Sequence, residues 1–196
     1  MADIPMYHEG SRELQDRFGS RKLADRLVEV LAHAELGAAE RDFIQSRPMF
    51  FLATADAAGR PDCSYKGGAP GFVRVMDPRT VVFPSYDGNG MWKSLGNLLV
   101  NPHVGMLFID FESPKRLRVN GCASLDEKDP LLAEFPGAQL LVRVQTHAIF
   151  ANCPRYIHRM PMGDLSVYTP GQEQAPPEPA WKSRPEFCDV LPPKRS

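Results

Sequence analysis

The stretch FPSYDGNGMWKSLGNLLVNPHVGMLFIDFESPKRLRVNG, residues 83–121, decides the fold. A polar, glycine-containing loop at 87–90 opens a short helix. Asn101-Pro102 ends that helix, because a proline disfavours helical geometry in the residue before it. One strand that is apolar throughout and one that alternates then follow. The stretch therefore predicts a helix followed by two strands.

The predicted helix has one apolar face at positions i, i+4, i+7 and i+8, made by Met91, Leu95, Leu98 and Leu99. Asp87 or Asn89 can cap its start. Lys93 and Ser94 lie in the first turn, where free backbone N–H groups already favour an anion. An ammonium and a hydroxyl at this end suit a phosphate. The same residues also fit a capped surface helix with an ordinary lysine.

The second strand, at 115–125, has two different faces. One face carries Leu117, Val119, Gly121 and Ala123, and the other carries Arg116, Arg118, Asn120 and Cys122. Two arginines and an asparagine on one face suit an anionic or polar heterocyclic ligand, since arginine can make forked hydrogen bonds. A solvated sheet face has the same pattern.

Short strands with regular turns extend through the rest of the chain. Strands are predicted at 49–55, 62–66 and 139–150, with a further hairpin across 77–79. About six strands with this spacing predict a mainly β fold, a six-stranded antiparallel barrel. Helices are predicted at 11–34, interrupted at Gly19, and at 38–45. We expect them to pack against the outside of the barrel, with a role in binding a partner as the alternative.

Two segments combine polar side chains with the features of a binding loop. In SYKGG (64–68) the glycines allow close backbone approach, while Ser64 and Lys66 offer a hydroxyl and a cation; a strand end before a flexible loop fits as well. NCPRY (152–156) places a thiol, a guanidinium and a phenol at a strand end, and a turn with packed side chains is the alternative. Cys153 has weak support as a nucleophile, because a buried thiol is usually inert.

The order of these pieces resembles the FMN-binding split-barrel family that includes pyridoxamine 5′-phosphate oxidase. The resemblance covers roughly residues 43–151 and rests on RPDCSYKGGAPGFVRV, the helix, Asn-Pro, VGMLFIDF and KRLRVNGCASL. It implies the FMN-binding type of split barrel, mainly β with flanking helices. The expected organisation is a helical segment at 1–48 packed on the barrel, the split-barrel domain at 49–160 and a proline-rich tail at 161–196.

The resemblance also implies a cofactor, a reaction class and an assembly. It implies an FMN-dependent oxidoreductase that acts on an unidentified small molecule, with FMN at the interface of a homodimer. The residues that it implies for cofactor binding are Ser64, Tyr65, Lys66, Gly67, Asn89, Lys93, Ser94 and Arg116. Cys153 remains the weak candidate for catalysis, and Arg155 or Tyr156 would act across the dimer.

The sequence departs from the family in two places. Pyridoxamine-phosphate oxidases end in an arginine- and histidine-bearing segment that grips the substrate phosphate, whereas this chain has NCPRYIHR and a proline-rich tail. The family's Arg-Lys pair at the helix start is Lys93-Ser94 here. The alternatives are a flavin-binding or electron-transfer protein without turnover, and a split barrel that binds haem or a deazaflavin.

Composition excludes several other classes of protein. The 196 residues carry a formal charge of −1, which argues against a nucleic-acid binder. No apolar run approaches the ~20 residues that span a bilayer, and the polar N-terminus is unlike a signal peptide, so we expect a cytoplasmic protein. The four cysteines have no metal-ligand or disulfide spacing, and we expect reduced thiols and no metal site.

Overall fold

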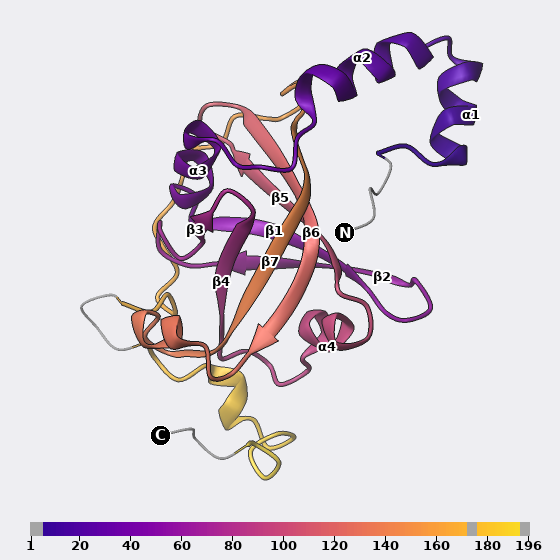
Figure 1. Cartoon of the computed structure of the whole chain (residues 1–196). Coiled ribbons are helices and arrows are strands. Elements are labelled where there is room, and N and C mark those ends of the chain that lie inside the picture. Colours follow the sequence, from indigo (N-terminus) through magenta and orange to yellow (C-terminus); the bar gives the residue numbers. More distant parts are fainter. Residues whose placement is uncertain (1–5, 172–175, 193–196) are drawn as a thin grey trace.

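The computed structural model describes residues 6–171 and 176–192. The parts of the expected N-terminal segment and tail at 1–5, 172–175 and 193–196 lie outside the described residues. Figure 1 shows the elements, which in chain order are α1 (Glu9–Arg17), α2 (Arg21–Leu31), α3 (Ala38–Gln45), β1 (Met49–Ala55), β2 (Pro61–Gly67), β3 (Arg74–Asp77), β4 (Thr80–Tyr86), α4 (Lys93–Val100), β5 (His103–Asp110), β6 (Lys115–Asp126), the 3₁₀ helix η1 (Pro130–Glu134), β7 (Ala138–Ala151) and the 3₁₀ helix η2 (Ala180–Ser183).

The strands form one antiparallel sheet in the order β2-β1-β5-β6-β7-β4-β3. The mainly β architecture with flanking helices is thus confirmed. The expected number of six strands is wrong, because both arms of the hairpin across 77–79 join the sheet and bring the number among the described residues to seven. The edge strands β2 and β3 are not paired with each other in the part of the chain that the structure describes, so the sheet is not closed.

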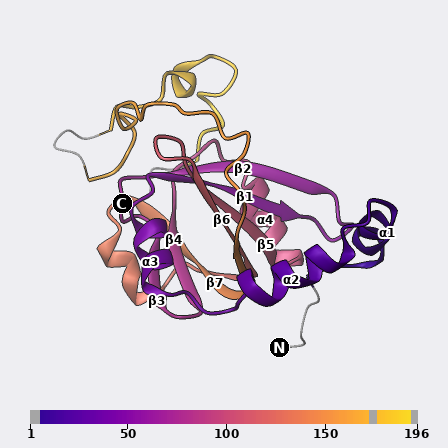
Figure 2. The same cartoon turned by 90° about the horizontal axis from the view of Figure 1, so that it is seen from above.

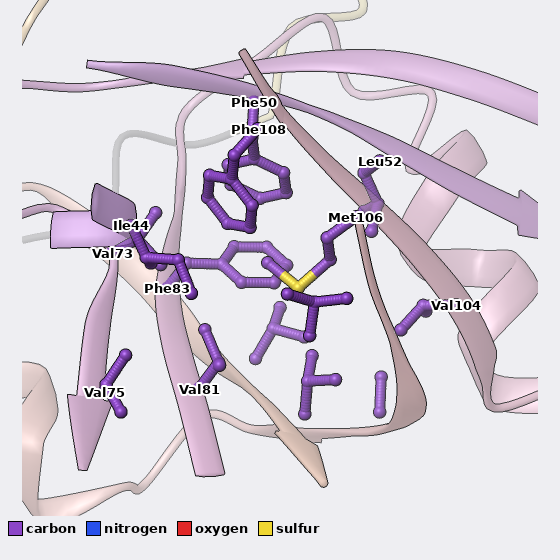
Figure 3. Packing of buried hydrophobic residues seen from close by; sticks show 14 of the residues in the cluster. Ile44, Phe50, Leu52, Val73, Val75, Val81, Phe83, Val104, Met106 and Phe108 are labelled. Carbon is purple, nitrogen blue, oxygen red and sulfur yellow. The ribbon is translucent and has the colours of Figure 1, made fainter. Parts of the chain in front are cut away.

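The sheet nevertheless curls around a single core. Phe50 of β1 and Phe83 of β4 are separated by three strands in the sheet order, yet their ring centroids lie 5.0 Å apart. Phe108 of β5 lies 5.1 Å from Phe50, and all three side chains are at most 1% exposed. Figure 3 shows these rings and Met106 pointing toward one another inside the curled sheet. Residues that face this core are called inner, and the opposite face of the sheet is called outer.

A bulge between β6 and β7 changes which residues of β7 face the core. Asn120 pairs with Ala148 but Gly121 pairs with Thr146, so one residue of β7 is extra. The two faces of β7 therefore exchange beyond the bulge, and Ile149 is the fully buried residue there. Only glycine fits at 121, since a Cβ there would lie 2.4 Å from the backbone oxygen of Gln145.

The two long N-terminal helices project from the sheet as an arm. The predicted interruption at Gly19 is confirmed, because Gly19 has φ +65° between α1 and α2. Within one chain, α1 packs on α2, and α2 contacts the sheet at β7. Their apolar residues, such as Phe18 (78% exposed) and Val30 (68% exposed), face solvent. Figures 1 and 2 both show α1 and α2 extending away from the strands, with α2 reaching the sheet near the end of β7.

The remaining helices lie against the sheet. α3 has the predicted bounds and buries Ile44 completely against the core. α4 follows β4 and packs on β1, β2 and β6. Among the described residues, no helix is both long enough and apolar enough to cross a membrane.

Candidate functional site

The inner face of β2 carries three polar side chains at alternate positions. Asp62, Ser64 and Lys66 pair across the strands with Thr54, Leu52 and Phe50 of β1, all of which are buried. Cross-strand partners lie on the same face of a sheet, so these three polar side chains point toward the interior side of the edge strand. β2 therefore presents a carboxylate, a hydroxyl and an ammonium in a line beside the core.

The start of α4 packs beside these three residues of β2. Ser94 is 6% exposed, and its Oγ lies 2.9 Å from Oγ of Ser64 and 3.4 Å from a carboxylate oxygen of Asp62. One turn later, Asn97 donates to Oγ1 of Thr54 at 3.0 Å in a buried contact. These bonds fix α4 on β1 and β2, so the structure brings together the predicted residues Ser64 and Ser94.

The expected apolar face of this helix is right for Leu95 and Leu98 and wrong for Met91 and Leu99, and the expected cap is wrong. Its buried face consists of Ser94, Leu95, Asn97 and Leu98, whereas Met91 precedes the helix and is 71% exposed and Leu99 is 75% exposed. The cap residue is Trp92, in the left-handed region at φ 51° and without a side-chain hydrogen bond to the helix. Asn89 instead accepts from the backbone N–H of Met91 at 3.0 Å. The hydrogen bonds of Ser94 to Ser64 and of Asn97 to Thr54 hold this polar side of the helix against the sheet.

Lys66 lines a pocket of about 230 Å³ between β2, the end of β4 and α4. Phe72, Phe83 and Tyr86 supply aromatic walls, and Leu95 comes from α4. Burial lowers the pKa of the Lys66 ammonium, and the attraction of Asp62 opposes that shift. Burial also raises the pKa of the Tyr86 hydroxyl. The pocket thus combines flat apolar walls with one partly desolvated cation, and its one carboxylate, Asp87, is paired with Lys182. This combination suits a flat anion.

The other predicted residues near this pocket are more exposed. Asn89 and Lys93 lie in solvent at the α4 start. Tyr65 points to the outer face and is 62% exposed. The space in front of Gly67 is taken by the ring of Tyr65, since a Cβ at 67 would lie 2.6 Å from that ring. Close packing by the chain's own aromatic side chain therefore accounts for this glycine.

Arg116 lies on the other side of the sheet. It pairs with Ile109 of β5, while the neighbouring Leu117 is 4% exposed and faces the core. Arg116 is thus an outer residue and Lys66 an inner one, so a single chain does not bring them to one cleft. Among the described residues, the buried Nε of Arg116 and Oδ1 of Asn152 have no hydrogen-bond partner.

Cys153, Arg155 and Tyr156 follow β7 in an exposed turn. Nε of Arg155 donates to Sγ of Cys153 at 3.5 Å, and the backbone and side-chain hydrogen bonds from Arg155 lower the pKa of the thiol. Tyr156 is 90% exposed and has φ 69°. The interpretation of Cys153 as buried is wrong, and all four cysteines are free thiols.

Sequence reasoning missed Asp62 beside the pocket and the aromatic residues that line it. Asp62 carries a detectable signal, because it shares the alternation of Ser64 and Lys66 on an edge strand. In the sequence, Phe83 and Tyr86 are recognisable only as parts of a strand. Nothing local indicates that β4 faces β2 across the opening of the curled sheet.

Comparison with known proteins identifies relatives at the level of family and fold. Residues 36–164, about two thirds of the 196-residue chain, match the sequence model of a family described as pyridoxamine 5′-phosphate oxidase. Among curated proteins, none matches the chain.

Several solved structures are similar at low identity. A protein from Lactobacillus delbrueckii, provisionally named a pyridoxamine 5′-phosphate oxidase, is 22% identical, with 60% of this chain and 95% of that chain covered and a TM-score of 0.49. An FMN-binding protein from Syntrophomonas wolfei is 11% identical, with 71% and 97% covered and a TM-score of 0.43. The haem storage protein HutZ from Vibrio cholerae is 24% identical, with 57% and 89% covered and a TM-score of 0.41.

Proposed function

The chain belongs to the pyridoxamine 5′-phosphate oxidase family, and on that premise we propose that it is a flavoprotein. It binds FMN and uses it to oxidise or reduce a small molecule. The family model covers β1 to β7, the part of the chain that builds the pocket beside Lys66. When bound, FMN supplies hydride or single-electron transfer at its flat ring system.

The observation that carries this proposal is the state of Lys66. Within the described part of the chain its ammonium makes no hydrogen bond or ion pair, and burial lowers its pKa. Asp62 attracts the ammonium but does not bond it, and an anionic ligand in contact with Lys66 would offset the remaining cost of burying this cation. Phosphate or the polar edge of a flavin ring would supply the negative charge, while Phe83 and Tyr86 offer flat surfaces for the ring. Lys93, exposed at the start of α4, is a second cation for the same ligand.

The other proposed contacts divide between the two faces of the sheet. Ser64 lies on the same face of β2 as Lys66, and its bond to Ser94 positions the start of α4. Tyr65, Gly67 and Asn89 surround the same strand end and loop. Arg116 is on the outer face, and we assign it to a flavin held by a second copy of the chain.

Two surfaces of the chain support a homodimer. On the outer face, Tyr65, Phe51, Leu107, Arg118 and Phe150 form a continuous cross-strand row from β2 to β7. This row ends beside the turn that carries Arg155 and Tyr156, which a second copy would bring near its flavin. Burial of the row in a dimer interface would also offer partners to the buried polar atoms of Arg116 and Asn152. The arm presents the second apolar surface.

The test is the visible spectrum and the cofactor content of the purified protein. We expect absorption maxima of oxidised flavin, FMN after heat release, and loss of bound FMN in Lys66→Ala. Lys128→Ala is the matched control, because Lys128 is an exposed lysine far along the chain from this pocket. A Soret band would replace the proposal with haem binding, and a protein that stays colourless after incubation with FMN would contradict it. Bleaching by NADH or NADPH separates an enzyme from a carrier that does not turn over.

A further inference from the structure

A second pocket lies on the outside of the Lys66 site, under a segment that follows β7. This segment, residues 160–170, is called the strap. The backbone N–H of Met160 donates to the carbonyl of Phe111 at 3.1 Å, and that of Met162 donates to Glu112 at 3.2 Å. At the other end Thr169 is 8% exposed, and Pro170 lies against Gly137. The strap is thus anchored at both ends, and Figure 2 shows residues after β7, in orange and yellow, passing along the side where β2 and β1 lie.

The strap and the rim of the sheet enclose a pocket of about 280 Å³. This volume is close to the lower limit of ~300 Å³ for pockets that bind small molecules. Tyr65, Gly67, Tyr86 and Asp87 line both this pocket and the one beside Lys66. The two hollows therefore adjoin each other at the end of β2, with the strap as the far wall.

The two pockets differ in charge. Asp87 lines both pockets, and the inner pocket contains in addition the ammonium of Lys66. The strap pocket contains the carboxylates of Asp87 and Asp164, and none of the described residues that line it is an arginine, a lysine or a histidine. Asp87 pairs with Lys182 of η2 at 2.6 Å, which holds the chain after the strap next to this rim. Asp164 remains as an exposed negative charge.

The walls of the strap pocket are largely aromatic and apolar. Tyr65, Tyr86 and Tyr168 provide three rings from three segments, and Met49, Met162 and Leu165 add apolar surface. Tyrosine presents a flat apolar body together with a hydroxyl, which suits a flat molecule that has both apolar and polar edges. A phosphate group placed here would face the carboxylate of Asp164, while Asp87 is already paired with Lys182 and no described lining residue is a cation.

We propose that the strap pocket binds the substrate of the flavin and selects an uncharged or cationic, flat, amphipathic molecule while rejecting phosphate esters. That the ligand is a substrate rests on the proposed flavin function, whereas the pocket and its charge preference do not depend on a flavin. Anions are assigned to the Lys66 pocket, where the cofactor phosphate belongs, and the substrate takes the neighbouring hollow. The chain would thus act on a substrate without the phosphate that gives its family its name.

The experiment compares two probes that differ only in a phosphate. Pyridoxamine and pyridoxamine 5′-phosphate are titrated into the FMN-loaded protein by isothermal titration calorimetry. We expect pyridoxamine, which carries a protonated amine, to bind at least about tenfold tighter than its phosphate ester. Equal affinities, tighter binding of the phosphate ester, or no binding of either probe would each overturn the assignment of the pocket.

Variants of the strap test whether pyridoxamine binds in the strap pocket. Tyr168→Ala should weaken pyridoxamine binding by at least about tenfold, because it removes one aromatic wall. Val167→Ala is the control, since Val167 belongs to the strap, is 62% exposed and does not line the pocket. Asp164→Asn should reduce the preference for pyridoxamine over its phosphate ester. Pyridoxamine binding that is unchanged in Tyr168→Ala would refute the location.

The flavin content of every sample is measured first, so that failure of the proposed flavin function can be distinguished from failure of the inference about the strap pocket. A protein that binds pyridoxamine in this pocket but takes up no FMN would refute the flavin function and leave the pocket as a binding site. A protein that is loaded with FMN but shows no preference between the probes would refute only the inference about the strap pocket.

Discussion

The division of the proposed flavin contacts between two faces of the sheet leads to a prediction about mixed dimers. Lys66 is an inner residue of β2 and Arg116 an outer residue of β6. If FMN lies between two copies, each site takes Lys66 from one copy and Arg116 from the other. In a symmetric dimer both sites have this composition. A dimer of one Lys66→Ala chain and one Arg116→Ala chain then has one intact site and one doubly defective site.

The size of the effect follows from the contacts that are lost. A hydrogen bond to a charged group contributes about 1.5–3 kcal/mol. Each single variant should therefore bind FMN roughly 10- to 150-fold more weakly than the unchanged protein. The mixed dimer should recover tight binding at one of its two sites, which is about half of the flavin content per chain.

Co-expression of the two chains with different affinity tags, followed by two purification steps, gives the mixed dimer alone. Flavin content per chain and the FMN dissociation constant are then read from absorbance and flavin fluorescence. The matched control combines Lys66→Ala with Ser64→Ala, because both residues lie on the inner face of the same strand. In that control each site is defective and no recovery is expected.

Three outcomes would refute the reasoning. Tight FMN binding by the Arg116→Ala homodimer would remove Arg116 from the site. Absence of recovery in the mixed dimer would show that Arg116 does not act across the interface. Recovery in the Ser64 control would show that the inner residues of β2 do not act together in one site.

Further predictions concern the dimer and the stability of the fold. Leu27→Glu, on the exposed apolar face of α2, should weaken the dimer in sedimentation experiments while the melting temperature of the monomer stays the same; an unchanged dimer would exclude the arm from the interface. Gly121→Ala should lower the free energy of unfolding by about 1–3 kcal/mol in urea titrations, because the added Cβ meets the backbone of Gln145, and an unchanged midpoint would contradict the tight bulge. Arg143 bonds Asp129 at 2.9 Å and lowers the pKa of that carboxyl, so the contribution to stability is present above the pKa of an unfolded aspartate, ~3.9, and is lost as the pH falls below it. Arg143→Met should abolish this part of the acid dependence, and identical pH profiles of stability would disprove it.

The local elements were predictable because their causes are local. The break at Gly19 and the bounds of α3 follow from residues a few positions apart in the chain. The alternation of Arg116 and Leu117 in β6 sets one side chain outward and the next inward, as period-two geometry requires. The same alternation placed Ser64 and Lys66 on one face of β2.

The sequence by itself therefore determined where most strands lie, the family and the common face of Ser64 and Lys66, whereas the tertiary structure alone decided how the strands meet. Only the curl of the sheet brings Phe83 within 5.0 Å of Phe50, and only the strap anchored at Met162 builds a pocket on the rim. The tertiary structure also placed Arg116 and Lys66 on opposite faces of the sheet. The physical reason is that hydrophobic alternation fixes which face a side chain occupies, while the contacts between strands far apart in the chain depend on how all of them pack around one core.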